Sequence, residues 1–274
     1  MVQVNEFRIQ MPFTPEEFRI GQLYAIAEMS EEQSSADEGV EILKNEPFEN
    51  KTLGKGQYTH KIYHAGDRLP AVFKPFIPSK MLDFHEEAWN AFPYCKTIVT
   101  CPYFGKKFGM SIISQHKLGA HDEADDEENP LNLKPEVLKK RKIKYLDIAN
   151  DKLVDKYDEK EDPKKIKLDK TEPNRGPLTD DGKWHKNEKT VMTCYKVVTV
   201  KCTLIPVGVK AIEKKILEMQ SKIFHAVHRK LYCSANRWIN LSMEDVRAKE
   251  AEIQAKMKEL YKDSKKGSTT SKKK

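Results

Sequence analysis

Residues 192–204 read MTCYKVVTVKCTL, which is the strongest strand signal in the chain. The β-branched run VVTV at 197–200 is typical of a strand that packs on a pleated surface. Apolar residues then recur at helical spacing between 212 and 231, which predicts a helix over 210–233. A buried strand that leads into a long helix favours a sheet covered by helices.

A second helix is predicted toward the C-terminus. Ser242, with Asp245 three residues later, has the spacing of a capping box, so the helix begins there and runs to about Tyr261. Residues 263–274 are rich in Lys, Ser and Thr, and we expect them to form a basic, disordered tail. The 274-residue chain is therefore expected to form a single domain over residues 1–262.

Toward the N-terminus the pattern changes to alternating strands. Residues 2–11 alternate, and Thr14 with Glu17 predicts a helix that runs to about Met29. Residues 152–189 are charged and rich in turn residues, which predicts a long ordered loop. Further strands are expected at Gln57–His64, Cys95–Phe104, Phe108–His116 and Ile143–Ala149. Strands come early and long helices late, so the predicted class is α+β, an antiparallel sheet with helices gathered on one side.

Composition limits the class of protein. Hydrophobic residues make up 38% of the chain, enough for a sizeable core, and no apolar run approaches the ~20 residues that span a bilayer. Residues 1–11 do not resemble a signal peptide, and no lipidation motif is present. The five cysteines include no C-x-x-C pair, so neither a disulfide framework nor a zinc site is indicated. We therefore expect a cytoplasmic protein that meets membranes only peripherally.

Charge is unevenly distributed along the chain. Residues 1–133 hold 13 Lys and Arg against 21 Asp and Glu, a charge of −8, whereas residues 134–274 hold 36 against 21, a charge of +15. A basic half indicates an anionic partner, which could be a membrane surface or a nucleic acid. A solvated, lysine-rich surface explains the same numbers equally well.

No catalytic or metal-binding motif is legible. Gly54-Lys55-Gly56-Gln57 lacks the spacing of a phosphate-binding loop, and no nucleophile elbow is present. His225 and His228 have a spacing that could suit a metal, but no carboxylate pattern accompanies them, so no metal and no cofactor are predicted. Cys95 has no signature of a nucleophile.

Polar residues do occur on predicted strands. Thr59 and Lys61 share one face, Ser114 lies between apolar neighbours, and Lys196 lies within the most apolar strand. Each alone is explained by an exposed outer sheet face. Together they suggest a partly polar interior, such as a cavity for an amphiphile.

Several blocks of sequence resemble a known family. They are QYTHKIYH at 57–64, EAWNAFPYC at 87–95, EDP at 161–163, RGPL at 175–178 and YKVVTVK at 195–201. These blocks are similar to the phosphatidylinositol transfer proteins over about residues 2–262. Cys95 favours the single-domain class of that family, although Thr100-Cys101-Pro102 and the long charged loop look more like its multidomain retinal-degeneration class.

The resemblance implies a fold and a function. The family fold is a concave antiparallel sheet of about eight strands wrapped on long helices, related to the START-type helix-grip domains, which encloses one phospholipid. The implied cargo is phosphatidylinositol or phosphatidylcholine, carried by a monomer that contacts membranes transiently, binds no nucleic acid and is not an enzyme.

The resemblance also implies three groups of site residues. The inositol ring would be held by Thr59, Lys61, Asn90 and Glu250. The phosphate and neighbouring headgroup region would be contacted by Gln22, Cys95, Thr97, Ser114 and Lys196. Membrane docking would use Phe73, Phe76, Ile77, Met81, Leu82, Leu204, Ile205, Pro206 and Val207.

This chain departs from the family pattern at three places. The docking tip commonly carries two tryptophans, where this chain has Leu-Ile-Pro-Val, and Leu168 stands where some relatives have a serine. Ser114 replaces a threonine, which keeps the hydroxyl. Three alternatives also stay open. The second lipid could instead be phosphatidic acid or sphingomyelin. A cavity enzyme on the same fold would need a nucleophile and a base, and none is legible. A nucleic-acid-binding module would need aromatic platforms, but the basic segment 134–189 offers only Tyr145, Tyr157 and Trp184.

Overall fold

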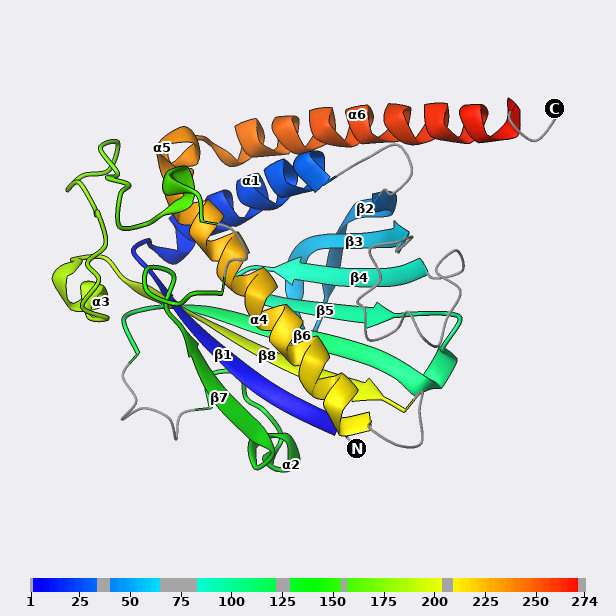
Figure 1. Ribbon diagram of the computed structural model, residues 1–274, viewed down its shortest axis with the longest axis horizontal. Coiled ribbons are helices and arrows are strands. Elements are labelled where there is room, and N and C mark those ends of the chain that lie inside the picture. Colours follow the sequence, from blue (N-terminus) through cyan, green and yellow to red (C-terminus); the bar gives the residue numbers. More distant parts are fainter. Residues whose placement is uncertain are drawn as a thin grey trace.

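The computed structural model describes residues 2–33, 40–64, 83–121, 129–153, 157–203 and 209–270. One eight-stranded sheet runs through the molecule, and long helices pack on its inner face (Figure 1). The strands are β1 Val2–Met11, β2 Val40–Asn50, β3 Gly54–His64, β4 Asp83–Ala91, β5 Tyr94–Thr100, β6 Phe108–Leu118, β7 Arg141–Leu146 and β8 Met192–Cys202. This confirms the α+β class.

The strand order is β2-β3-β4-β5-β6-β8-β1-β7. Every neighbouring pair is antiparallel except β1 and β7, which run parallel with Val4 opposite Arg141. The sequence predicts an antiparallel sheet, and this pair differs because the chain crosses from β6 past the β8 and β1 positions before it enters β7. β8 then fills the gap between β6 and β1, so the strongest sequence strand lies inside the sheet.

Three long helices cover the inner face: α1 Pro15–Gln33, α4 Val209–Cys233 and α6 Met243–Thr270. Helix α4 crosses the sheet, and α1 and α6 lie side by side near one end of it (Figure 1). Both capping boxes are confirmed, since the Glu17 amide donates to Thr14 Oγ1 at 3.2 Å and the Asp245 amide donates to Ser242 Oγ at 3.1 Å. The short helices are η4 Gly105–Lys107, α2 Pro135–Leu138, η6 Glu159–Glu161, α3 Trp184–Asn187 and α5 Ala235–Trp238.

Two strands are missing from the sequence prediction, and several boundaries differ from it. Strand β2 was not predicted, because its alternation is broken by a bulge between Ile42 and Lys44 and by the polar run that follows. Strand β4, Asp83–Ala91, was not predicted because charged and apolar residues are mixed on both of its faces. Strand β5 ends at Thr100, four residues before the expected end at Phe104. Helix α1 continues past Met29 to Gln33. Strand β7 covers Arg141–Leu146, two residues earlier than expected at its start. Helix α6 extends to Thr270, past the expected end near Tyr261, because the Lys-rich sequence there contains no proline and tolerates helix.

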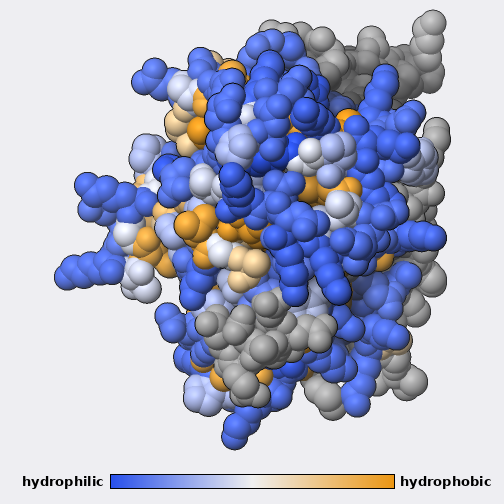
Figure 2. Space-filling view, turned by 90° about the vertical axis from the view of Figure 1, so that its left-hand side faces the viewer, coloured by the Kyte–Doolittle hydropathy of each residue, from blue (hydrophilic) through white to orange (hydrophobic). Residues whose placement is uncertain are grey.

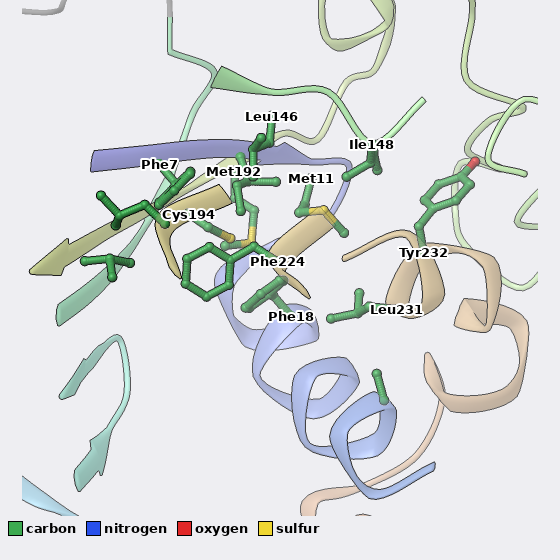
Figure 3. Packing of buried hydrophobic residues seen from close by; sticks show 14 of the residues in the cluster. Phe7, Met11, Phe18, Leu146, Ile148, Met192, Cys194, Phe224, Leu231 and Tyr232 are labelled. Carbon is green, nitrogen blue, oxygen red and sulfur yellow. The ribbon is translucent and has the colours of Figure 1, made fainter. Parts of the chain in front are cut away.

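The core lies between the sheet and helices α1 and α4 (Figure 3). Phe7 of β1 meets Phe224 of α4 edge to face with ring centroids 5.4 Å apart. Phe13 packs against Trp238, which is fully buried at the turn between α4 and α6. Of the apolar residues at helical spacing in α4, Ile212, Ile216 and Leu231 are buried in this core, whereas Ile223 is 50% exposed.

The segment 157–189 is an ordered loop, as the sequence predicts, and buried polar contacts hold it to the helices. Arg175 donates to both carboxylate oxygens of Glu17 in α1, at 2.8 and 3.0 Å. Arg229 of α4 donates to the carbonyls of Ile148 and Glu161, each at 2.7 Å. The surface on this side of the molecule is mainly hydrophilic with small apolar patches between charged side chains (Figure 2).

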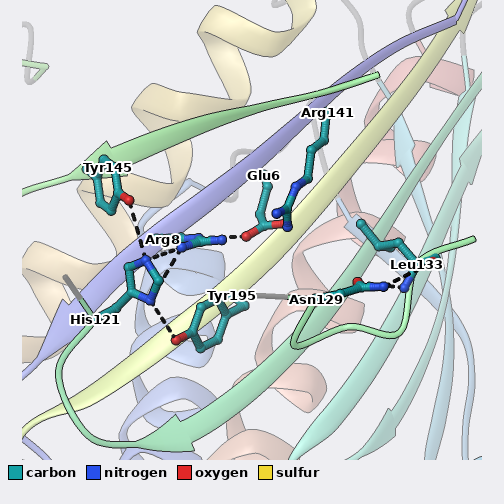
Figure 4. A network of polar contacts seen from close by, with 8 residues as sticks. All are labelled: Glu6, Arg8, His121, Asn129, Leu133, Arg141, Tyr145 and Tyr195. Atoms are coloured by element: carbon teal, nitrogen blue, oxygen red, sulfur yellow. Dashed lines mark hydrogen bonds and ion pairs between the residues drawn. The ribbon is translucent and has the colours of Figure 1, made fainter. Parts of the chain in front are cut away.

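The outer sheet face carries a polar network of its own. Arg8 donates to Glu6 at 2.6 Å and also contacts His121, while Glu6 pairs with Arg141 (Figure 4). These side chains alternate with Phe7 and Ile9, which point into the core. Polar strand residues therefore occur on both faces of the sheet, and only the register shows which ones face inward.

Close helix packing at Gly21 leads to the first testable prediction. A Cβ added there would lie 2.5 Å from an atom of the rigid, buried Trp238 ring. We expect Gly21→Ala to lower the free energy of unfolding. Overpacking against the Trp238 ring costs ~1–3 kcal/mol, whereas the higher helix propensity of alanine adds less than ~1 kcal/mol of stability. Urea denaturation measures this, with Gly109→Ala as the matched control since nothing lies within 4 Å of its added Cβ. Equal stability of the two variants would contradict the packing.

Candidate functional site

The strand register brings most of the sequence-predicted site residues onto the inner face. One continuous row crosses six strands, in which each residue lies opposite the next. It runs Gln57, Asn90, Cys95, Ser114, Lys196 and Phe7. Phe7 belongs to the core beneath α4, so the whole row faces the helices.

A second and a third row lie beside the first. Thr59, Ala88 and Thr97 form part of the second, which continues into apolar residues on β6 and β8. Lys61 begins the third and lies directly opposite Glu86. Glu86 was missed from the sequence, although its alternation with Ala88 and Asn90 could have placed it on the same face. Seven of the nine predicted headgroup residues therefore share one sheet face.

The other two predicted headgroup residues come from the helices above that face. Gln22 of α1 and Asn90 and Cys95 of the first row line one pocket of about 240 Å³. Glu250 of α6 and Lys61 line a neighbouring pocket of about 40 Å³. Thr59 lies between these residues on β3, so the polar groups gather where β3 and β4 meet α1 and α6.

Arg247 links the two pockets. It lines the larger pocket and donates to the Glu250 carboxylate at 2.6 Å, one helical turn away on α6. The Oε1 atom of Gln22 is buried and accepts no hydrogen bond from the described part of the protein. A buried acceptor without a donor is costly, so this corner is suited to a ligand that brings hydroxyl groups.

Lys196 lies near the middle of the first row and is only 7% exposed. Its ammonium nitrogen lies 5.4 Å from the centroid of the Phe224 ring. No carboxylate pairs with it among the residues that the structure describes. Burial raises the pKa of the Cys95 thiol, which lies two strands away in the same row, to about 11, so that thiol is neutral at physiological pH. A buried cation among neutral groups is a site for an anion.

The same face becomes apolar toward one end of the sheet. Beyond the polar rows it carries Val99, Met110, Ile112, Val198 and Val200. Ile212 and Ile216 from the first turns of α4 pack in the same cluster. The inner face is therefore polar at one corner and apolar at the opposite end, which matches the two parts of a phospholipid.

The predicted membrane-docking residues cannot be placed. Phe73, Phe76, Ile77, Met81, Leu82, Leu204, Ile205, Pro206 and Val207 all lie outside the described residues. The described residues that flank them, His64, Asp83 and Cys202, lie at the apolar end of the sheet. None of the described helices is long and apolar enough to cross a membrane.

The two histidines with metal-like spacing bind backbone carbonyls instead. A ring nitrogen of His225 bonds to Asp147 O at 3.2 Å, and Nδ1 of His228 bonds to Phe224 O at 2.6 Å. No group of three or more potential metal ligands occurs in the part of the chain that the structure describes. These contacts assign the pair to the core of the protein.

Buried histidines predict acid sensitivity. Burial, followed by the charge of Lys196, lowers the pKa of His116 from 6.5 to about 3 and that of His228 well below 6.5. Because the unfolded chain binds protons at these positions below pH ~6.5 and the folded chain does not, stability is retained above that pH and lost as the pH falls. We expect the free energy of unfolding to drop by up to ~1.4 kcal/mol per pH unit for each histidine.

Urea denaturation between pH 7 and pH 4.5 measures this dependence. His116→Gln removes one titrating group, so its stability should fall less steeply with decreasing pH than that of the unsubstituted protein. Parallel slopes would show that His116 does not contribute.

Known proteins with similar sequences identify the family of this chain. A family model described as "Phosphatidylinositol transfer protein" matches residues 2–255. Phosphatidylinositol transfer protein 1 of Dictyostelium discoideum is 42% identical over 93% of this chain and 94% of its own length. Phosphatidylinositol transfer protein 2 of the same organism is 41% identical over 96% and 98%. The beta isoform of Rattus norvegicus is 40% identical over 98% and 97%. This chain therefore belongs to the phosphatidylinositol transfer protein family.

Proposed function

We propose that this protein carries one phosphatidylinositol or phosphatidylcholine molecule at a time between membranes. The observation that carries the proposal is the inner face itself, which holds a buried Lys196 cation in a polar row and turns apolar toward one end of the sheet. The family match and the names of the relatives support phosphatidylinositol as a cargo.

The polar corner suits an inositol ring. Thr59, Lys61, Glu86 and Asn90 come from two adjacent strands, and Glu250 faces them from α6. A ring with several hydroxyl groups needs donors and acceptors that converge on it, because an unpaired hydroxyl in a buried site is costly. Phosphatidylcholine has no such hydroxyls, so it would depend on the phosphate contacts alone, at Gln22, Thr97, Ser114 and Lys196.

The acyl chains would lie between the apolar end of the sheet and α4. Moving two chains of about thirty methylenes in total through water costs roughly 25 kcal/mol at ~0.8 kcal/mol each, which is why a closed carrier is needed. The pockets of about 240 and 40 Å³ lie at the polar corner, whereas the apolar side chains are packed against each other.

We propose that the protein acts as a monomer in the cytosol and docks transiently through the segments that contain Phe73–Leu82 and Leu204–Val207. Their apolar residues would enter the interface at the end of the sheet where the acyl chains are held. No cofactor is proposed, because the bound phospholipid is the cargo.

A transfer assay tests this function. Donor vesicles carry one labelled lipid and acceptor vesicles carry none, and transfer is measured separately for phosphatidylinositol, phosphatidylcholine, phosphatidic acid and sphingomyelin. We expect the first two to move at rates proportional to protein concentration. Transfer of phosphatidic acid or sphingomyelin in place of phosphatidylcholine would assign a different second ligand, and no transfer of phosphatidylinositol would overturn the proposal.

A further inference from the structure

The turn between β5 and β6 lies at the apolar end of the sheet, beside the last residues of β8 (Figure 1). Phe108 at the start of β6 lies opposite Cys202, and the Thr203 amide donates to Lys107 O at 2.7 Å. Thr203 is the last described residue before the segment that contains Leu204–Val207. A backbone hydrogen bond therefore ties the β5–β6 turn to the chain that leads into that segment.

The turn combines a buried ring with an exposed one. The amides of Phe104 and Gly105 both donate to Cys101 O, each at 3.0 Å. The Phe104 ring is 7% exposed and packs on Phe108 with centroids 6.1 Å apart. Tyr103, the residue before it, is 52% exposed. The turn therefore anchors Phe104 in the core and presents Tyr103 at the surface.

Three exposed lysines accompany Tyr103. Lys106 and Lys107 belong to η4, and Lys201 lies near the end of β8, two residues before Thr203. None of the three forms an ion pair with a carboxylate within the ranges that the structure describes. Their charges therefore face solvent.

Three carboxylates at this end of the sheet are paired or buried. Those of Asp83 and Glu41 lie 2.8 and 3.4 Å from the ring nitrogens of His64. Glu213, in the first turns of α4, is fully buried and accepts the Cys202 amide at 3.0 Å. They leave the lysines of the β5–β6 turn and of the end of β8 as unpaired surface cations.

We propose that Tyr103, Lys106, Lys107 and Lys201 form a membrane-contact surface that selects bilayers containing anionic lipids. The tyrosine ring enters the interface, and the lysines lie against the negatively charged headgroups. The choice of a bilayer as the partner rests on the proposed function, because a carrier must reach a membrane to exchange its cargo.

A bilayer suits these residues better than an acidic protein does. Tyrosine is enriched at membrane–water interfaces because its ring is apolar while its hydroxyl stays hydrated. A lysine close to an anionic leaflet strengthens binding roughly fivefold. The surface also lies at the end of the sheet that flanks the two proposed docking segments, so the cations and the apolar segments would meet the same bilayer.

Vesicle co-sedimentation of the intact protein tests this surface. One set of vesicles is phosphatidylcholine alone, and in the other part of it is replaced by phosphatidylserine. We expect Lys106→Gln with Lys107→Gln to weaken binding to the anionic vesicles roughly 25-fold and to leave binding to the neutral vesicles unchanged. Raising the salt to ~1 M should remove this difference, because the Debye length falls to ~3 Å.

The matched control is Lys117→Gln with Lys189→Gln. These two exposed lysines carry the same charge near the opposite end of the sheet, where Lys117 lies opposite Thr193 and Lys189 precedes β8. This variant should bind both kinds of vesicle as the original protein does. Tyr103→Ala should weaken binding to both kinds by a similar factor, because insertion of the ring does not depend on lipid charge.

Two results would overturn the proposal. One is equal binding of the original protein to neutral and anionic vesicles. The other is equal binding of the Lys106 and Lys107 double variant and its control to the anionic vesicles. Transfer of phosphatidylinositol by the original protein is measured in parallel. Its absence would contradict the proposed function, whereas lysine-dependent binding to anionic vesicles would still support this surface.

Discussion

Replacing Lys61 or Asn90 with alanine is expected to reduce phosphatidylinositol transfer at least tenfold while phosphatidylcholine transfer stays close to its original rate. Lys61 lies opposite Glu86 at the polar corner, and Asn90 lines the neighbouring pocket with Gln22. Each side chain can pair with ring hydroxyls that only the inositol lipid has. For Lys61, loss of a hydrogen bond to a charged group costs ~1.5–3 kcal/mol, about 10- to 150-fold in binding. For Asn90, which is neutral, a buried hydroxyl left without its partner costs ~1–3 kcal/mol, about 5- to 150-fold.

The matched control for Lys61 is Lys96→Ala. Lys96 lies on the outer face of β5, where its ammonium is 5.8 Å from the Trp89 ring centroid, so it cannot reach the cavity. Transfer of both lipids by this variant should equal that of the original protein. If Lys61→Ala lowered the transfer of both lipids equally, the inositol ring would not lie at the corner between β3, β4 and α6.

Replacing Lys196 with methionine is expected to reduce the transfer of both lipids by about 10-fold or more without lowering the stability of the empty protein. The phosphate is common to the two cargoes, and a charge-assisted hydrogen bond to it is worth ~1.5–3 kcal/mol. Burying the ammonium, by contrast, carries a desolvation cost that an apolar side chain of similar length does not. Lipid-free protein should therefore unfold at the same or a higher urea concentration in this variant.

These two measurements separate binding from folding. Loss of transfer together with unchanged or increased stability assigns Lys196 to the phosphate. Transfer that survives in Lys196→Met would place the phosphate elsewhere, and a large loss of stability would show that Lys196 supports the fold and not the cargo.

The local elements could be predicted where sequence pattern and burial agree. Strand β8 and helix α4 carry unbroken apolar patterns, and the capping boxes at Thr14 and Ser242 mark helix starts through contacts within one turn. Strand β2 could not be predicted, because an edge strand with a bulge needs no regular alternation of polar and apolar residues. The parallel pairing of β1 with β7 is set by tertiary packing that no local pattern encodes.

In the candidate site, too, local sequence pattern predicts some features, whereas others depend on tertiary packing. Alternation alone puts Thr59 and Lys61 on one face, but it does not say whether that face is the inner one. The outer face carries Arg8 and Glu6 with comparable polarity (Figure 4). Pairing of Lys61 with Glu86 requires the register of two strands, and the approach of Glu250 requires the packing of α6 on α1. From the sequence, only the resemblance to the transfer proteins groups Thr59, Lys61 and Glu250, and it does not include Glu86.

Native mass spectrometry of the intact protein purified from cells measures whether this chain encloses one phospholipid, as we propose. We expect a species heavier than the 31.7 kDa chain by the mass of one phospholipid, which fragments to release phosphatidylinositol or phosphatidylcholine. The Lys196→Met variant prepared in parallel should be mostly empty. A bare chain in the original protein, or a bound molecule without a phosphate group, would contradict this proposal.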